Sequence, residues 1–163
     1  MTRLKRLFFG QNPRRTLIRA GVLAVLAYGV FGYAIRPARV KGISMEPTLR
    51  DGEYHVLNLL AYRFREPVRG DIVAIPMPGG RAFFLKRILA LPGETVAFNA
   101  GTLFINGFPV DEPYLVDLGD WQSKALTVPE DGYFVAGDNR STPFSGHALG
   151  LVEKRQLAGT LLK

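Results

Sequence analysis

A serine at position 44 and a lysine at position 86 have surroundings that suit them for chemistry. Ser44 lies in the stretch 42–49, which reads GISMEPTL and places a glycine before the serine and a proline after it. A serine hydroxyl is a poor nucleophile until a base takes its proton. Lys86 follows the apolar residues 83–85, and burial among such side chains would lower its pKa from about 10.4 toward neutrality. The two residues therefore predict acyl transfer with lysine as the general base.

The same residues leave other assignments open. A strand lysine can cover apolar surface with its stem and keep its ammonium group in water. The usual base for a serine is a histidine with an acid partner, and the chain has two histidines, His55 and His147. His55 lies in a strand-like run, where we expect a structural imidazole. His147 lies in a loop, so Ser44, His147 and Asp138 form the alternative triad.

The elements that must position these residues are short strands. Each apolar run after residue 37 is rich in β-branched and aromatic residues and is bounded by turn residues. Asn106-Gly107 predicts a tight hairpin between two of them. We therefore expect an all-β domain of antiparallel sheet with a small inserted β lobe at about 98–131, where several acidic residues cluster. The strand-like runs are 54–60, 71–75, 82–88, 95–98, 102–105 and 132–136.

An apolar segment at 17–35 precedes the strands and predicts one transmembrane helix. Apart from Arg19 it carries no charge, and its length is sufficient to cross a bilayer. A buried core helix would show a polar face, which is not visible here. A cleaved signal peptide, the closer alternative, would have a shorter apolar region and a small-residue cleavage site. Because more basic residues precede the segment than follow it, we expect residues 1–16 in the cytoplasm and 36–163 outside the cell membrane.

The net charge of +7 comes from the N-terminal part of the chain. Residues 1–41 hold nine basic and no acidic residues, whereas the rest holds twelve basic and fourteen acidic residues. A domain without a basic stripe is not typical of nucleic-acid binding. The chain has no cysteine, which excludes disulfides, thiolate metal sites and a cysteine nucleophile. The histidines lack metal-site spacing, so we expect no metal and no cofactor.

Four motifs in order resemble the type I signal peptidases. They are the serine stretch 44–49 (SMEPTL), Gly70-Asp71-Ile72-Val73, Lys86-Arg87 followed by LPGE at 91–94, and Gly137-Asp138-Asn139-Arg140. The apolar segment stands in front of them, as it does in that family. The resemblance covers nearly the whole chain and implies a β-rich, membrane-bound serine endopeptidase that removes signal peptides from exported precursors. It implies lipid and precursor proteins as partners, cleavage after small residues at Ala-x-Ala sites, and a monomer.

The resemblance also assigns roles to residues. Ser44 would be the nucleophile and Lys86 the general base of a Ser/Lys dyad. The backbone N–H of Ser44 would form the oxyanion hole, and Gly42 takes the position where some members have an assisting serine. The residues implied to line the pockets for substrate side chains are Val40, Ile43, Met45, Phe84 and Leu85. Those implied to support the site are Arg87, Asp138, Asn139, Arg140 and Ser145.

The loop after Arg140 departs from the family pattern. The serine that would hydrogen-bond the lysine aligns with Pro143, which has no hydroxyl. We therefore expect a shifted loop in which Ser141, Thr142 or Ser145 supplies the hydroxyl that hydrogen-bonds Lys86.

Two further function classes remain as alternatives. LexA-like self-cleaving peptidases share the dyad, but they carry a soluble N-terminal arm with an Ala-Gly or Cys-Gly cleavage bond. Here the Ala-Gly pairs lie in the apolar segment or in the β region. A membrane-tethered binding domain without catalysis is the second alternative, and the altered loop is the feature that favours it.

Overall fold

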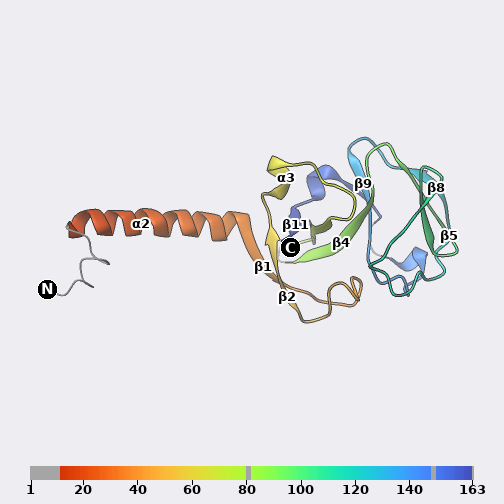
Figure 1. Cartoon of the computed structure of the whole chain (residues 1–163), viewed down its shortest axis with the longest axis horizontal. Coiled ribbons are helices and arrows are strands. Elements are labelled where there is room, and N and C mark those ends of the chain that lie inside the picture. The colour runs from red at the N-terminus through yellow and green to blue at the C-terminus, as the bar shows by residue number, and fades with distance from the viewer. Residues whose placement is uncertain (1–11, 80–81, 148–149, 163) are drawn as a thin grey trace.

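The N-terminal helix projects away from the rest of the molecule. The computed structural model describes residues 12–79, 82–147 and 150–162. Helix α2 (Pro13–Gly29) continues into a π-helical turn, η1 (Val30–Ala34), and none of the residues in either is buried. Figure 1 shows them as one rod that leads into the β domain. Pro13–Ala34 is long and apolar enough to cross a membrane, and no other helix in the described part of the chain is.

The bounds of this helix differ from the expected 17–35. The helix begins four residues earlier, at Pro13, and Ile35 already belongs to the first strand. Proline suits the first helical turn because its missing N–H has no partner there anyway. Arginine is a good helix former, so the backbone helix extends past the end of the apolar stretch. Residues 1–11 of the expected cytoplasmic segment 1–16 lie outside the described residues.

The larger sheet has seven strands in the order β1-β2-β11-β3-β4-β9-β10, and the pairings are antiparallel. Its strand β4 pairs with β3 from Phe83 to Arg87, but with β9 only from Arg87 onward. Residues 83–86 therefore have one side with no strand partner among the described residues. The strands are β1 (Ile35–Arg39), β2 (Tyr54–Asn58), β3 (Ile72–Pro76), β4 (Phe83–Ala90), β9 (Gly132–Ala136), β10 (Leu151–Glu153) and β11 (Gly159–Leu161).

The smaller sheet has four strands in the order β7-β6-β5-β8 and forms the inserted lobe. It spans Thr95 to Thr127, so it begins slightly before the expected 98–131. The hairpin predicted at Asn106-Gly107 is confirmed, because both residues have positive φ (53° and 82°), as a type I′ turn requires. The strands are β5 (Thr95–Asn99), β6 (Thr102–Ile105), β7 (Phe108–Val110) and β8 (Ser123–Thr127).

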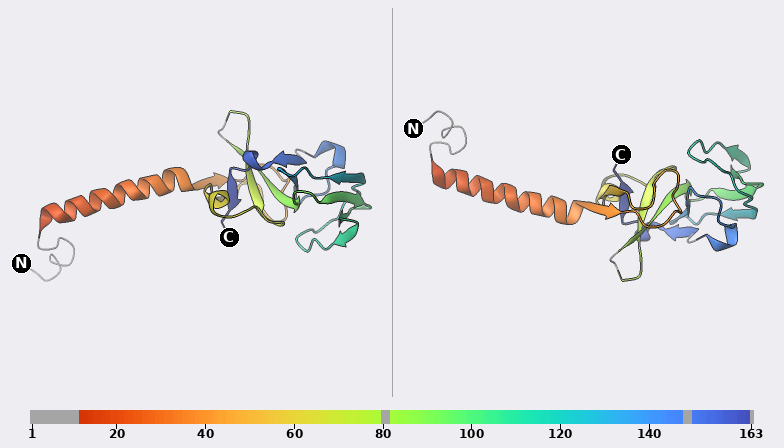
Figure 2. Two further views of the ribbon diagram at one scale, coloured as in Figure 1. Left: turned by 90° about the horizontal axis from the view of Figure 1, so that it is seen from above. Right: turned by 90° about the horizontal axis from the view of Figure 1, so that it is seen from below.

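The lobe and helix α2 lie at opposite ends of the molecule, as the two views in Figure 2 show. Strands β4 and β9 lead from the larger sheet toward the lobe (Figure 1). The short helices are α3 (Ala61–Phe64), η2 (Phe144–Gly146) and η3 (Lys154–Gln156). The expected all-β domain behind a single apolar helix is thus confirmed, because the helices that follow β1 in the described residues are single turns.

Three apolar clusters hold this arrangement together. One lies in the lobe around Trp121 and Phe98, and it reaches β9 through Phe134. A second fills the larger sheet around Val73 and Ile88. The third is small and lies under the stretch that carries Ser44; its members are Val40, Met45, Leu49 and Ile72, with Leu85 and Leu161 packed against it. The clusters connect the lobe to the sheet, and they support the turn that exposes Ser44.

Candidate active site

The loop that carries Ser44 is anchored by its apolar residues. Met45 is only 1% exposed and Leu49 is almost as deeply buried, and both belong to the third apolar cluster. The Leu49 N–H donates to the Met45 carbonyl over 2.9 Å, which closes a helix-like turn. Ser44 itself is exposed. Burial of its neighbour therefore fixes the position of the serine while its side chain remains open to a substrate.

The loop after β9 holds the Ser44 backbone from the other side. The Asn139 N–H donates to the Ser44 carbonyl (3.1 Å), and the Asn139 side-chain amide donates to the Ile43 carbonyl (3.1 Å). Gly137 lies against the same carbonyl, so a Cβ at this position would overlap the Ser44 oxygen and lie 3.3 Å from the Lys86 Nζ. The Ser44 carbonyl and the Lys86 amine thus both lie against Gly137, which has no side chain to separate them.

Lys86 is a buried amine. It lies on β4 and is 3% exposed. Burial lowers its pKa below the ordinary value of 10.5, and the negative charge of Asp138 opposes this shift without cancelling it. No carboxylate in the described part of the chain forms an ion pair with Lys86. Burial therefore shifts the protonation equilibrium of Lys86 toward the neutral amine, which is the form that can accept a proton.

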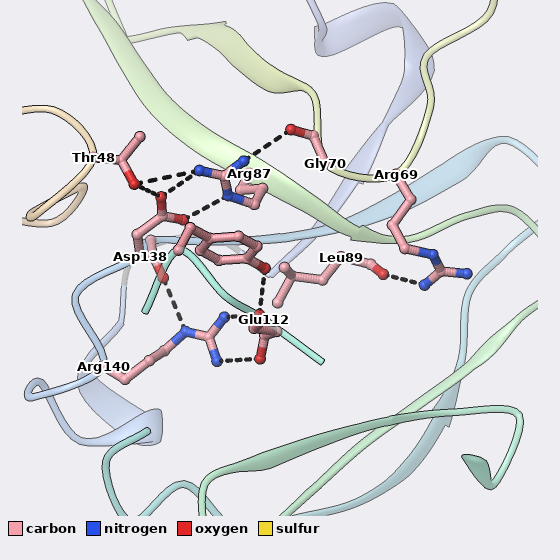
Figure 3. Close-up of polar contacts among 10 residues, drawn as sticks. Thr48, Arg69, Gly70, Arg87, Leu89, Glu112, Asp138 and Arg140 are labelled. Carbon is pink, nitrogen blue, oxygen red and sulfur yellow. Dashed lines mark hydrogen bonds and ion pairs between the residues drawn. The ribbon is translucent and has the colours of Figure 1, made fainter. Parts of the chain in front are cut away.

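Asp138 and Arg87 form a buried ion pair that contacts Thr48 (Figure 3). Arg87 donates from Nε to Asp138 Oδ1 (2.9 Å) and from Nη2 to Asp138 Oδ2 (2.6 Å), and its Nη1 donates to the Gly70 carbonyl (3.0 Å). The Thr48 hydroxyl donates to Asp138 Oδ2 over 2.5 Å. The pair thus connects β4, the loop after β9 and the loop of Ser44, because Thr48 belongs to that loop.

A second buried ion pair connects the same loop to the lobe. Arg140 donates to both carboxylate oxygens of Glu112 (3.1 and 2.6 Å) and to the Gly137 carbonyl (3.0 Å). The Tyr114 hydroxyl donates to Glu112 over 2.5 Å, and the Tyr114 ring lies 3.8 Å from the Arg87 guanidinium. Burial raises the pKa of Tyr114 most, and the charge of Glu112 raises it further. The Tyr114 hydroxyl therefore stays neutral and can donate a hydrogen bond. The two ion pairs therefore form one continuous network (Figure 3).

Sequence reasoning missed part of this network. Thr48, Glu112, Tyr114 and Gly137 are in it, although none was expected among the site residues. Thr48 and Gly137 lie inside the quoted motifs, so the motifs contained a signal for them. Glu112 belongs to the acidic cluster of the lobe, and no local pattern separates it from the other acids there. Only its 6% exposure and its pairing with Arg140 distinguish it.

The loop 141–147 is directed toward the lobe. The Ser141 hydroxyl donates to the Asn139 side chain over 2.6 Å, and the Trp121 ring N–H donates to the Thr142 carbonyl over 2.7 Å. Ser145 is exposed on η2. None of these three hydroxyls makes a hydrogen bond to Lys86 within the described residues. The expected donor for Lys86 is therefore not found, because Trp121 holds the loop away from it.

The histidines lie apart from Ser44. His147 stacks on Phe144 and packs against Trp121, with ring centroids 5.2 and 4.8 Å apart, and its Nδ1 is 2.9 Å from the Phe144 carbonyl. Both oxygens of Asp138 are bonded to Arg87, so the Ser-His-Asp alternative has no Asp-His pair among the described residues. His55 lies on β2 beside Glu53, at 3.1 Å, as a strand side chain.

The residues expected to line substrate pockets are only partly brought together. Val40, Met45 and Leu85 share the third cluster, whereas Phe84 packs against the cluster of the larger sheet. Ile43 is 56% exposed beside Ser44. Gly42 adopts φ +88°, and its N–H donates to Asp51, so it shapes the turn before Ser44. In the described part of the chain, no group of three metal-ligating side chains occurs.

An antiparallel β fold behind one apolar helix, with an exposed serine next to a buried lysine, defines the class of serine peptidases held at a membrane. A family model described as signal peptidase, peptidase S26, matches residues 14–162. The chain is 38% identical to signal peptidase I of Bacillus licheniformis over 90% of this chain and 83% of that protein. It is 33% identical to signal peptidase I V of Bacillus subtilis over 91% of this chain and 96% of that protein.

A crystal structure of a signal peptidase I from Enterococcus faecalis has the same fold. It superposes with a TM-score of 0.50 at 35% identity and covers 60% of this chain and 98% of that one. The chain therefore belongs to the S26 family of signal peptidases, serine proteases that remove signal peptides. This confirms the resemblance from the four motifs and the expected class of enzyme, and the N-terminal apolar helix fits a membrane-anchored member.

Proposed function

We propose that this signal peptidase works as a Ser/Lys dyad, with Ser44 as nucleophile and Lys86 as general base. The observation that carries the proposal is that the backbone of Ser44 and the buried Lys86 amine both lie against Gly137. Lys86 takes the Ser44 proton as Oγ attacks the scissile carbonyl, and it returns that proton to the leaving amine. A water deprotonated by Lys86 then attacks the acyl ester, which releases the signal peptide and regenerates Ser44.

The oxyanion would be stabilised by the Ser44 backbone N–H. This group donates to no other described residue, so it is available to a substrate oxygen. Loss of one such donor costs about 2.7–4 kcal/mol in barrier height. The buried ion pairs of Asp138 and Arg140 support this role because both hold the loop whose Asn139 binds the Ser44 carbonyl.

The substrate would bind as an added strand. Residues 83–85 of β4 have an open side before β9 begins to pair, and residues 38–43 lead to Ser44. An extended peptide can hydrogen-bond to such an edge, and pockets for alternate side chains then provide specificity. The small side chain before the scissile bond would face Met45 and Leu85. We also propose that α2 anchors a monomer with its N-terminus in the cytoplasm, so that the β domain meets exported precursors outside.

The residue before the scissile bond tests this function. A precursor with an Ala-x-Ala site should be cut after the second alanine. Replacement of that alanine by phenylalanine should lower kcat/KM by about 10- to 100-fold, because overpacking costs about 1–3 kcal/mol. Product termini determined by mass spectrometry give the site and the rate. As a control, phenylalanine at the middle position should have little effect, since alternate side chains of a strand point to opposite faces. Equal tolerance at both positions would contradict the pocket.

The pH dependence of kcat/KM tests the base. Because Lys86 must be neutral to accept a proton, activity should rise with pH through the Lys86 pKa. Burial lowers that pKa, so the rise should lie below the ordinary value of 10.5. The profile is measured with a precursor that has no titrating group near its cleavage site. A rise centred at the ordinary lysine value would exclude Lys86 as a base made active by burial.

A further inference from the structure

A hollow of about 240 Å³ lies beside the loop that carries Ser44. Neither Ser44 nor Lys86 lines this hollow. Three segments line it: Glu46 and Pro47 from the loop of Ser44, Val116 and Asp117 from the lobe, and residues 138–140 from the loop after β9. We name it the lobe-side groove. Because the same loop after β9 holds Ser44 in place, the groove and the nucleophile share one rigid support.

The groove begins within reach of the scissile bond. Glu46 is two residues from Ser44, so their Cα atoms are at most about 7 Å apart. An extended substrate advances by about 3.3 Å per residue. The side chains that come near Glu46 are therefore those within about two residues of the bond that Ser44 attacks.

The direction of the substrate places the mature part of the precursor at this groove. On the proposed function, the signal-peptide side lies along residues 83–85 of β4 and the residues that precede Ser44. The membrane helix and the lobe lie at opposite ends of the molecule (Figures 1 and 2). A chain that arrives from the membrane end and crosses Ser44 continues toward the lobe. On this path, the residues after the scissile bond would run along the groove that Glu46 and Asp117 line.

The charges that line the groove do not cancel. The Asp138 carboxylate is paired with Arg87, and the Arg140 guanidinium is paired with Glu112, so these two ion pairs add no net charge. Glu46 and Asp117 have no ion pair in residues 12–79, 82–147 and 150–162. Asp117 accepts a hydrogen bond from the Gly119 N–H (2.9 Å), which fixes its direction at the lobe. Two uncompensated carboxylates therefore line the same hollow.

We propose that the lobe-side groove binds the first residues of the mature protein and selects their charge through Glu46 and Asp117. A basic side chain at the second position after the scissile bond is attracted, and an acidic one is repelled. This inference rests on the proposed function and adds to it a specificity determinant on the side of the lobe. The contact proposed at Met45 and Leu85 for the small side chain is separate from this groove, on the side of the signal peptide.

The test compares two precursors in the full-length enzyme in detergent micelles. They share one Ala-x-Ala site and differ only in lysine or glutamate at the second mature position. We expect kcat/KM to favour lysine by about tenfold, since each exposed charge pair is worth up to about fivefold. Glu46→Gln or Asp117→Asn should reduce the preference to about threefold, and the double variant should remove it. The Asp117→Asn change removes the charge but keeps a side-chain oxygen that can still accept the Gly119 N–H.

The ratio of two rates in one enzyme does not depend on how much of a variant is folded. Glu130→Gln removes an exposed acid outside the groove and should leave the tenfold preference unchanged. Equal cleavage of both precursors by the wild type would overturn the inference while the proposed function stands. A lysine preference that persists in the double variant would overturn it as well. If the wild type cleaves neither precursor, the proposed function fails, and this inference fails with it.

Discussion

Ser44→Ala and Lys86→Ala should each lower kcat/KM on an Ala-x-Ala precursor by about 10⁴- to 10⁶-fold, the range of loss when one member of a catalytic unit is removed. Ser44→Ala removes the attacking oxygen. Lys86→Ala removes the buried amine beside Gly137, which is the proposed base. The double variant should be little worse than either single variant, because the two residues act on the same step.

Two further variants make this result decisive. Lys124→Ala removes an exposed lysine on β8 and should leave cleavage unchanged, so a general effect of lost positive charge can be recognised. His147→Gln separates the dyad from the histidine alternative. If Lys86→Ala keeps its activity and His147→Gln loses it, the base is the histidine, and the proposed mechanism is wrong.

Asp138→Asn should destabilise the enzyme by about 3–5 kcal/mol, because it leaves the buried Arg87 guanidinium without its counter-charge. In a domain of this size that loss corresponds to a fall in Tm of about 10 °C. Thermal unfolding in detergent micelles measures it. Activity should fall as well, even at temperatures where the variant is folded, because the loop that carries Asn139 and Gly137 would lose its fixed position against Ser44.

The matched control is an exposed ion pair in the same protein. Glu66 and Lys154 lie 2.5 Å apart with side chains 70% and 45% exposed. Glu66→Gln removes the same charge as Asp138→Asn, but an exposed pair contributes only about 0–1 kcal/mol. If both variants unfolded at the same temperature, the Asp138–Arg87 pair would not be the structural centre of the site.

Local patterns in the sequence were sufficient for many of the elements, although strands β1, β8, β10 and β11 lie outside the predicted runs. The runs of β-branched and aromatic residues corresponded to strands because alternation and turn residues act over a few positions. Asn106-Gly107 formed its hairpin because both residues tolerate positive φ. The apolar segment became an unburied helix, and its ends differed only slightly, since helix formation continued through the basic residues up to Pro13. The four motifs were sufficient to indicate the family.

The tertiary structure alone decided how those parts meet. Glu112 was one acid among several in the lobe until folding paired it with Arg140. Phe84 and Leu85 alternate between the two faces of β4, as in any strand, but only the tertiary structure decided which apolar cluster covers each face. The loop 141–147 turned toward Trp121, far away in the sequence, and so did not supply a hydroxyl to Lys86. These contacts join segments that no short pattern relates, so packing between the sheet and the lobe determined them.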